Sequence, residues 1–435
     1  MCRSHCARAV RESMSNSDDT SPLVRPAMTL ALLSSASFLN SYDRSIFPII
    51  LEPMKRELAL TDTQVGLLVG PAFAILFAIV SIPMASFADK GRRAAVLAWA
   101  MGFWSLMTAL CGLATGFATM ALGRFGVGAG EGGGGPSINA LAADAFGVKR
   151  LATVLSVIVM GSNIGAATAL LAGGWLTDAF GWRCVFLVGG AAGLFISLAI
   201  ALALPRPTAH IVGVAPSSSI ATRISTLFRR PAFALLCAGI GLSSIALSSF
   251  TAWGPAFFIR KFHVSPGEVG RTYGIIHGCL AILIPLVAGL ISDRLARLDP
   301  RWPAYMLVII LLLSVPANFA FLSSSSFGAA LFLVVPVSFL QLAIVPPYYA
   351  LVQLLAGPQL RSSAAAVSGA IIYLMGYGLG PPLVGLMSDT FGWAGGANSL
   401  ERAMMLSLVS YFGGAAMFWL CARHVAAGQH AAAGA

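Results

Sequence analysis

The chain has 435 residues, of which 57% are hydrophobic and only 10% are charged, and its formal net charge is +11. Ordinary soluble domains contain about 45–50% apolar and about 25% charged residues, so a water-soluble fold could not cover this much apolar surface. The positive charges are dispersed through short polar segments and form no basic face beside aromatic residues, which argues against a nucleic-acid-binding protein.

Apolar runs follow one another along the whole chain. Each run is near the roughly 20 residues that a helix needs to cross the hydrocarbon core of a bilayer. The pattern predicts an all-α polytopic membrane protein with about twelve transmembrane helices. We expect these spans near residues 27–50, 62–88, 93–113, 117–144, 150–177, 184–204, 232–257, 268–292, 303–323, 327–354, 361–388 and 400–421.

A polar segment divides the predicted spans into two sets of six. Residues 205–231 are rich in Pro, Ser, Thr and Arg and form the longest polar interruption after the N-terminal tail. We therefore predict an N-terminal half at 27–204, a cytoplasmic linker at 205–231 and a C-terminal half at 232–422. Residues 1–26 lack the apolar core of a signal peptide and are predicted to be a disordered cytoplasmic tail, and 423–435 a second cytoplasmic tail.

The basic residues predict the orientation in the membrane. With the N-terminus inside, 18 of the 27 Lys and Arg fall in cytoplasmic segments, 7 in external segments and two within spans. Cytoplasmic loops of membrane proteins retain Lys and Arg preferentially. We therefore expect both termini to face the cytoplasm.

Two short stretches recur in the second half of the chain. The sequence GGWLTDAFGW at 173–182 resembles VGLMSDTFGW at 384–393, which pairs Asp178 with Asp389. The sequence ASFADKGRR at 85–93 resembles GLISDRLAR at 289–297, which pairs Asp89 with Asp293. Parallel repeats of this kind place a substrate site between two related halves in transporters.

These repeated loops resemble those of the major facilitator superfamily over residues 27–422. That family has Gly, three residues, Asp, a basic residue, two residues and Arg after its second span. The second-half copy keeps all four positions, whereas Ala85 replaces the glycine in the first copy. The fourth span also resembles the family's Arg-containing motif. The matching residues are Asp89, Lys90, Arg93, Gly289, Asp293, Arg294 and Arg297 in the loops, and Arg124, Gly128 and Gly130 in the fourth span.

Within the superfamily, the chain resembles the Spinster-type lipid and sphingolipid transporters and their bacterial relatives. The resemblance rests on YDRSIF at 42–47, LTDTQVGLL at 60–68 and Glu131, with Trp253 and its neighbours in the seventh span. Organic-anion symporters of the superfamily share the Asp-Arg pair and the Glu. The resemblance implies alternating access on an amphipathic lipid-like solute or an organic anion.

Four ionisable residues are predicted at membrane depth, where each charge costs at least about 2.5–3.5 kcal/mol. These are Asp43 and Arg44 in the first span, and Arg124 and Glu131 in the fourth. The resemblance implies that the first and fourth spans are neighbours that line the cavity. Because burial favours a protonated carboxyl and a neighbouring guanidinium favours an ionised one, Asp43 is then expected to alternate between Arg124 and a proton. The resemblance assigns proton coupling to this Asp, Arg and Glu set. A structural ion-pair network is the alternative.

Other residues are assigned to the cavity and to a conformational gate. Trp253 and Tyr373 are expected to line the cavity, whereas His277, the only histidine at membrane depth, is expected to pack. The resemblance implies that Asp89 lies against a helix N-terminus of the other half, near residues 361–363, and stabilises the outward-facing state. The gate residues are Asp89, Arg93, Asp293, Arg294 and Arg297.

The sequence favours a transporter over an enzyme. It carries no helical His-Glu metal motif, nucleophile elbow or His cluster, so we expect no catalytic residue, metal or cofactor. Expected partners are a small-molecule substrate, protons and the lipid bilayer of the cell inner membrane, without nucleic acid, and the protein is expected to be a monomer. Proton-driven efflux by antiport and a non-transporting membrane sensor are the alternatives.

Overall fold

The computed structural model describes residues 26–87, 93–204, 220–357, 360–393 and 398–433. These residues are almost entirely helical and contain no strand, which confirms the all-α fold class. Ten of the described helices or helix pairs are long and apolar enough to cross a membrane. The other two predicted spans correspond to α2, which carries several polar residues, and to α6, which has only 15 residues.

The first half follows the predicted spans with two internal breaks. A capping box at Thr61 begins α3, and Gly70 with Pro71 separates α3 from α4. Gly132 and Gly133 separate α6 from α7, which then runs through the predicted connection between the fourth and fifth spans. The helices are α2 (Pro26–Glu57), α3 (Asp62–Val69), α4 (Pro71–Phe87), α5 (Arg93–Gly112), α6 (Phe117–Glu131), α7 (Gly134–Phe180) and α8 (Trp182–Ala203).

The second half contains two π-helical segments, η3 (Gly270–Gly274) and η4 (Ile372–Tyr377), inside its second and fifth spans. Such segments are frequent at functional sites because they widen the helix locally and redirect its side chains. The helices are α9 (Ile220–Phe228), α10 (Pro231–Phe262), α11 (Pro266–Val269), α12 (Ile275–Leu298), α13 (Trp302–Leu322), α14 (Phe327–Ala343), α15 (Val345–Ala356), α16 (Arg361–Ile371), α17 (Gly378–Trp393), α18 (Ser399–Ser407) and α19 (Val409–Ala433).

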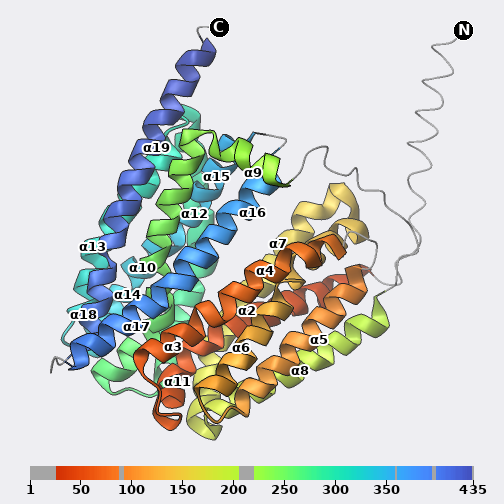
Figure 1. Cartoon of the computed structure of the whole chain (residues 1–435), viewed down its shortest axis with the longest axis vertical. Helices are drawn as coiled ribbons and strands as arrows, with labels where there is room; N and C mark the ends of the chain where they lie inside the picture. The colour runs from red at the N-terminus through yellow and green to blue at the C-terminus, as the bar shows by residue number, and fades with distance from the viewer. Residues whose placement is uncertain (1–25, 88–92, 205–219, 358–359, 394–397, 434–435) are drawn as a thin grey trace, which may run out of the picture.

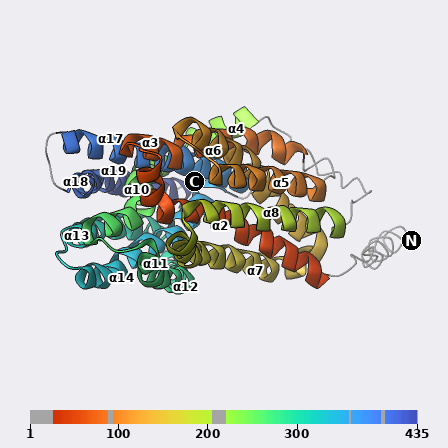
Figure 2. The same cartoon turned by 90° about the horizontal axis from the view of Figure 1, so that it is seen from below.

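The helices form two bundles that correspond to the two halves of the chain (Figure 1). The start of α2 and the end of α19 lie at one end of the molecule, which we call the termini end; the opposite end is the far end. The bundles meet at the far end, where α3 packs on α17, α2 on α10 and α7 on α11, and they diverge toward the termini end. Figure 2 shows the bundles side by side from below.

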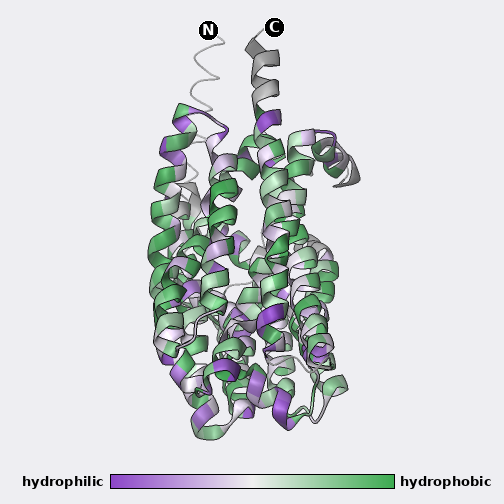
Figure 3. Cartoon of the chain, turned by 90° about the vertical axis from the view of Figure 1, so that its left-hand side faces the viewer, coloured by the Kyte–Doolittle hydropathy of each residue, from purple (hydrophilic) through white to green (hydrophobic). Residues whose placement is uncertain are grey.

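Hydropathy varies along the long axis of the molecule as a bilayer requires. Hydrophilic residues gather at the two ends, and hydrophobic residues cover the helices between them (Figure 3). Large apolar side chains on the outer faces of the helices are exposed, among them Trp99, Leu202 and Phe332. Because lipid tails solvate such side chains, these outer faces are the surface expected to contact the membrane.

Candidate transport cavity

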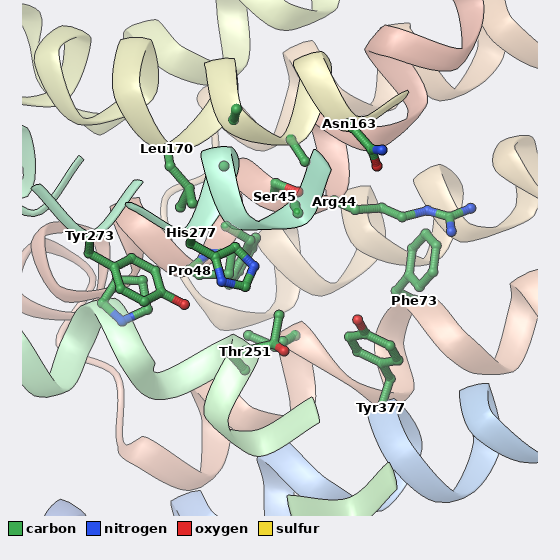
Figure 4. Close-up of a pocket in the computed structure, with 18 of the residues that line it drawn as sticks. Arg44, Ser45, Pro48, Phe73, Asn163, Leu170, Thr251, Tyr273, His277 and Tyr377 are labelled. Carbon is green, nitrogen blue, oxygen red and sulfur yellow. The ribbon is translucent and has the colours of Figure 1, made fainter. Parts of the chain in front are cut away.

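A cavity of about 280 Å³ lies between the two bundles. Its wall combines α2, α4, α6 and α7 of the first half with α10, η3, α12, α14 and η4 of the second. Phe73, Pro48 and Leu170 supply part of its apolar surface (Figure 4). The polar residues of the wall are Arg44, Ser45, Arg124, Asn163, Thr251, Tyr273, His277, Tyr373 and Tyr377.

Arg44 connects the two halves at the cavity wall. Its Nε donates to Oε2 of Glu131 at 2.6 Å, which forms an ion pair between α2 and α6. Its Nη1 donates to the Tyr373 hydroxyl on η4, which belongs to the second half. The Arg44 side chain retains 30% exposure while Glu131 has none. A single guanidinium therefore contacts a buried carboxylate, the opposite bundle and the cavity.

Aromatic rings enclose the Arg44 guanidinium. Its carbon lies 5.4 Å from the ring centroid of Phe73, 5.1 Å from that of Phe77 and 5.5 Å from that of Tyr373. Cation–π attraction strengthens when the cation is withdrawn from water. These rings hold the guanidinium at the cavity wall, and the Tyr373 ring packs on Phe77 at 4.7 Å.

Arg124 lies at the cavity without an ionic partner among the described residues. Its Nε donates to the Leu68 carbonyl at 3.2 Å, and its guanidinium lies over the rings of Phe47 and Phe73 at 4.8 and 5.2 Å. The expected ion pair with Asp43 is absent from the ion pairs of the described chain. The rings and the backbone carbonyl take the place of the carboxylate.

Two carboxyl groups are buried behind the cavity wall. Asp43 accepts a hydrogen bond from Thr108 Oγ1 at 3.3 Å, and its Oδ1 has no partner in the described chain. Glu131 accepts from Arg44 and from Asn40 Nδ2, the latter at 3.0 Å, through Oε2, whereas its Oε1 has no such partner. Each carboxyl therefore keeps one buried oxygen that is free to carry a proton.

The two aromatic residues predicted at the cavity have different positions. Tyr373 lines it, because the π-helical segment turns its ring toward Arg44. Trp253 is fully buried and is not among the lining residues. Its indole Nε1 donates to the Pro381 carbonyl at 3.1 Å, so it packs α10 against α17. The expectation that Trp253 lines the cavity is corrected accordingly.

The far end is closed by two equivalent contacts between the halves. Asp389 at the end of α17 accepts hydrogen bonds from the backbone amides of Asp62 and Thr63 at 3.0 and 2.8 Å, and from the Thr63 hydroxyl at 2.5 Å. Asp178 at the end of α7 accepts from the Gly267 amide at 3.0 Å and from a serine hydroxyl at 2.7 Å. These are the two aspartates of the sequence repeat, each bound to a helix N-terminus of the opposite half.

A charged cluster strengthens this closure. Arg260 of α10 donates to both oxygens of Asp62 at 2.7 and 2.6 Å and also contacts Glu52 of α2. Lys55 donates to Asp62 at 2.5 Å. Because Asp62 and Glu52 are buried, their ion pairs are less exposed to water than ordinary surface ion pairs are. The sequence did not indicate the cluster, because Arg260 lies in the second half of the chain, far from Glu52, Lys55 and Asp62.

The predicted gate residues lie at the termini end or outside the described residues. Asp89 falls in the segment that the structure does not describe. Arg93 forms an ion pair with Asp144 at 2.5 Å, a partner that the sequence did not indicate. The three residues of the second copy are exposed on α12 and make no hydrogen bond or ion pair with the described residues: Asp293, Arg294 and Arg297.

The sequence profile of the Major Facilitator Superfamily matches residues 33–381. The chain belongs to this superfamily. An MFS-type efflux pump of Mycolicibacterium smegmatis is 32% identical over 90% of this chain and 91% of the relative. Protein spinster homolog 1 of Homo sapiens is 27% identical over 90% of this chain and 80% of the relative.

A solved structure matches the fold closely. A bacterial homologue of the human lysosomal transporter Spinster, in an inward-facing and unoccupied conformation, superposes with a TM-score of 0.82 and 26% identity. The match covers 93% of this chain and 98% of that chain. The protein is therefore a multi-pass membrane transporter of this superfamily and not an enzyme, and its fold is similar to that of a bacterial Spinster homologue.

Proposed function

We propose that this superfamily member is a proton-coupled secondary transporter that moves an organic anion or an amphipathic lipid-like solute by alternating access. The observation that carries the proposal is the position of Arg44. This cation faces the cavity while it is paired with the fully buried Glu131. An anion in the cavity and the Glu131 carboxylate therefore compete for one guanidinium.

This competition couples the anion to a proton. When Glu131 is ionised, its charge occupies Arg44 at 2.6 Å and weakens the attraction of the site for an anion. When a proton neutralises Glu131, the guanidinium is released toward the cavity. Proton and anion therefore bind with positive linkage, and by reciprocity each raises the affinity for the other. Positive linkage is the behaviour of a symporter.

Asp43 is proposed as a second proton site. It lies beside Arg44 in the chain, is 3% exposed and has only Thr108 as a hydrogen-bond partner in the described chain. A buried carboxylate without a cation is strongly disfavoured, so any movement of α2 that brings a cation nearer changes its protonation. The protonation of Asp43 would then depend on the conformational state, whereas the protonation of Glu131 would depend on whether an anion binds Arg44.

The direction of opening follows if the termini are cytoplasmic, as the distribution of Lys and Arg predicts. The closed far end is then external, and the conformation is inward-facing. Alternating access would break the contacts of Asp178 and Asp389 and bring the termini ends of the bundles together. In that movement Arg44 must exchange its Tyr373 contact, because the contact spans the two halves. We further propose a monomer in the cell inner membrane.

Proton-driven efflux by antiport is a second candidate. It is favoured by the similarity to the efflux pump of Mycolicibacterium smegmatis, at 32% identity. Antiport requires proton and solute to compete for the protein. The sign of the linkage therefore separates the two functions, and a non-transporting sensor would bind a solute without moving it.

The test is the pH dependence of anion binding by the purified protein. We expect the affinity for small carboxylates that stay ionised over the range to rise as pH falls. Glu131→Gln should bind the anion tightly at every pH, because the permanently neutral side chain leaves Arg44 free. Glu57→Gln is the matched control, since this exposed residue pairs with Arg183 at the far end. Weaker binding at lower pH in the wild type contradicts symport and favours antiport.

A further inference from the structure

We propose that the transported solute is a compact organic anion that carries hydroxyl groups, and that Tyr273, His277, Tyr377 and Asn163 bind those hydroxyls. This inference rests on the proposed transport function, which it makes more specific. These four residues are among the six uncharged polar side chains that line the cavity in addition to the two guanidinium groups and Tyr373. Their free hydrogen-bonding groups are the basis of the argument.

Tyr273 and His277 form one polar end of the cavity. The His277 ring lies on the Tyr273 ring with centroids 5.6 Å apart and an interplanar angle of 16°. His277 Nδ1 shares a hydrogen bond with the Ser338 hydroxyl at 3.0 Å, which fixes the orientation of the ring. The stacked pair is therefore positioned by packing and by a third residue, as a binding group needs to be.

The outer atoms of this pair have no protein partner among the described residues. The Tyr273 hydroxyl and His277 Nε2 make no hydrogen bond with the described residues, and neither atom is fully buried from solvent. The Tyr377 hydroxyl and the Asn163 amide have the same property. Each group therefore has access to the cavity and unused capacity to donate or accept.

Unused polar groups of this kind discriminate between solutes. A solute hydroxyl that meets one of them gains about twofold to tenfold in affinity, whereas an alkyl group in the same place leaves the polar group unpaired. Sites built to hydrogen-bond a hydroxyl reject the analogue that lacks it much more strongly than apolar pockets reject an added methylene. The cavity wall thus favours hydroxylated solutes over alkyl ones.

The arrangement of polar groups defines the shape of the solute. Figure 4 shows Arg44, Phe73 and Tyr377 at one side of the cavity and Tyr273 with His277 at the other. A carboxylate at Arg44 would place the rest of the solute toward the stacked pair. A long acyl chain would instead bring hydrocarbon against these polar groups. At about 280 Å³, the cavity is just below the range of about 300–1,000 Å³ that is usual for small-molecule pockets, which also favours a compact solute.

The experiment compares gluconate, hexanoate and a lysophospholipid as probes of the purified full chain near neutral pH. Gluconate and hexanoate have the same carbon skeleton and charge but differ in hydroxyl groups. We expect gluconate to bind at least about tenfold more tightly than hexanoate. Tyr273→Phe and His277→Phe, which keep a stacked ring, should each weaken gluconate binding about fivefold to tenfold and leave hexanoate binding unchanged.

Tyr305→Phe is the matched control, because Tyr305 packs on Trp302 at the start of α13 and is not among the lining residues. Equal binding of gluconate and hexanoate, tighter binding of the lysophospholipid, or no binding of gluconate overturns this inference. In those cases the proposed proton coupling would still stand if a proton gradient drives transport of the probe that does bind. Conversely, selective gluconate binding without any pH linkage supports the hydroxyl site and contradicts the proposed coupling.

Discussion

The closure of the far end predicts the effect of replacing Asp389 by Asn. In the wild type, this carboxylate accepts three hydrogen bonds from residues 62 and 63 at the N-terminus of α3. The amide keeps one acceptor oxygen and loses the charge. We estimate a loss of about 2 kcal/mol from charge-assisted hydrogen bonding and the helix dipole, which corresponds to roughly a 30-fold shift away from the state closed at the far end.

The shift is measured as a distance distribution between spin labels across the far end. Exposed positions Arg56 on α2 and Arg402 on α18 are suitable label sites after conversion to cysteine in a background without the native cysteines. Asp389→Asn should populate a longer distance, and Asp178→Asn should do the same because it binds the equivalent helix start. Asp299→Asn at the termini end is the control. Unchanged distances in both variants would refute the role of these two aspartates in holding the far end closed.

Three further outcomes follow from the same geometry. Gly385→Leu should also open the far end in the spin-label measurement, because a Cβ there meets the Asp62 backbone of α3; a normal closed distance would contradict this close packing. Arg44→Lys should lower the initial rate of solute exchange more than about tenfold, since an ammonium cannot keep the planar contacts with Glu131 and the rings, and wild-type exchange would argue against the role of Arg44. Arg93→Gln should lower the stability in detergent by about 1 kcal/mol, because its ion pair with Asp144 is only partly exposed, at 19% and 28% of the two side chains; a loss of several kcal/mol would indicate a larger structural role.

The sequence predicted the helical fold well because a bilayer imposes length and hydropathy on each span. Most predicted spans overlap described helices, and the breaks at Gly70 and at Gly132 with Gly133 occur where helix propensity is lowest. The continuous α7 was not predicted, because Gly147, Lys149 and Arg150 interrupt the apolar run and indicate a connection between two spans, whereas the helix continues through them.

The sequence indicated which residues lie near the cavity better than it indicated how those residues contact one another. The cost of burying a charge in the membrane singled out four residues, and the structure brings them close to one cavity: Asp43, Arg44, Arg124 and Glu131. Which cation meets which carboxylate depends on helix rotation, and periodicity does not fix rotation to one residue. The expected Asp43–Arg124 pair is therefore replaced by the pair of Arg44 and Glu131. His277 was assigned to packing because its position relative to other helices was unknown.

The central claim is tested most directly by uptake into proteoliposomes under an imposed inward proton gradient. The screen includes gluconate, small carboxylates, lysophospholipids and sphingoid phosphates, with Asp43→Asn and Glu131→Gln beside the wild type. The account predicts gradient-driven accumulation of an anion by the wild type, while both variants retain at most exchange without accumulation. Accumulation that ignores the gradient, or that survives in both variants, would contradict proton coupling through these carboxyl groups.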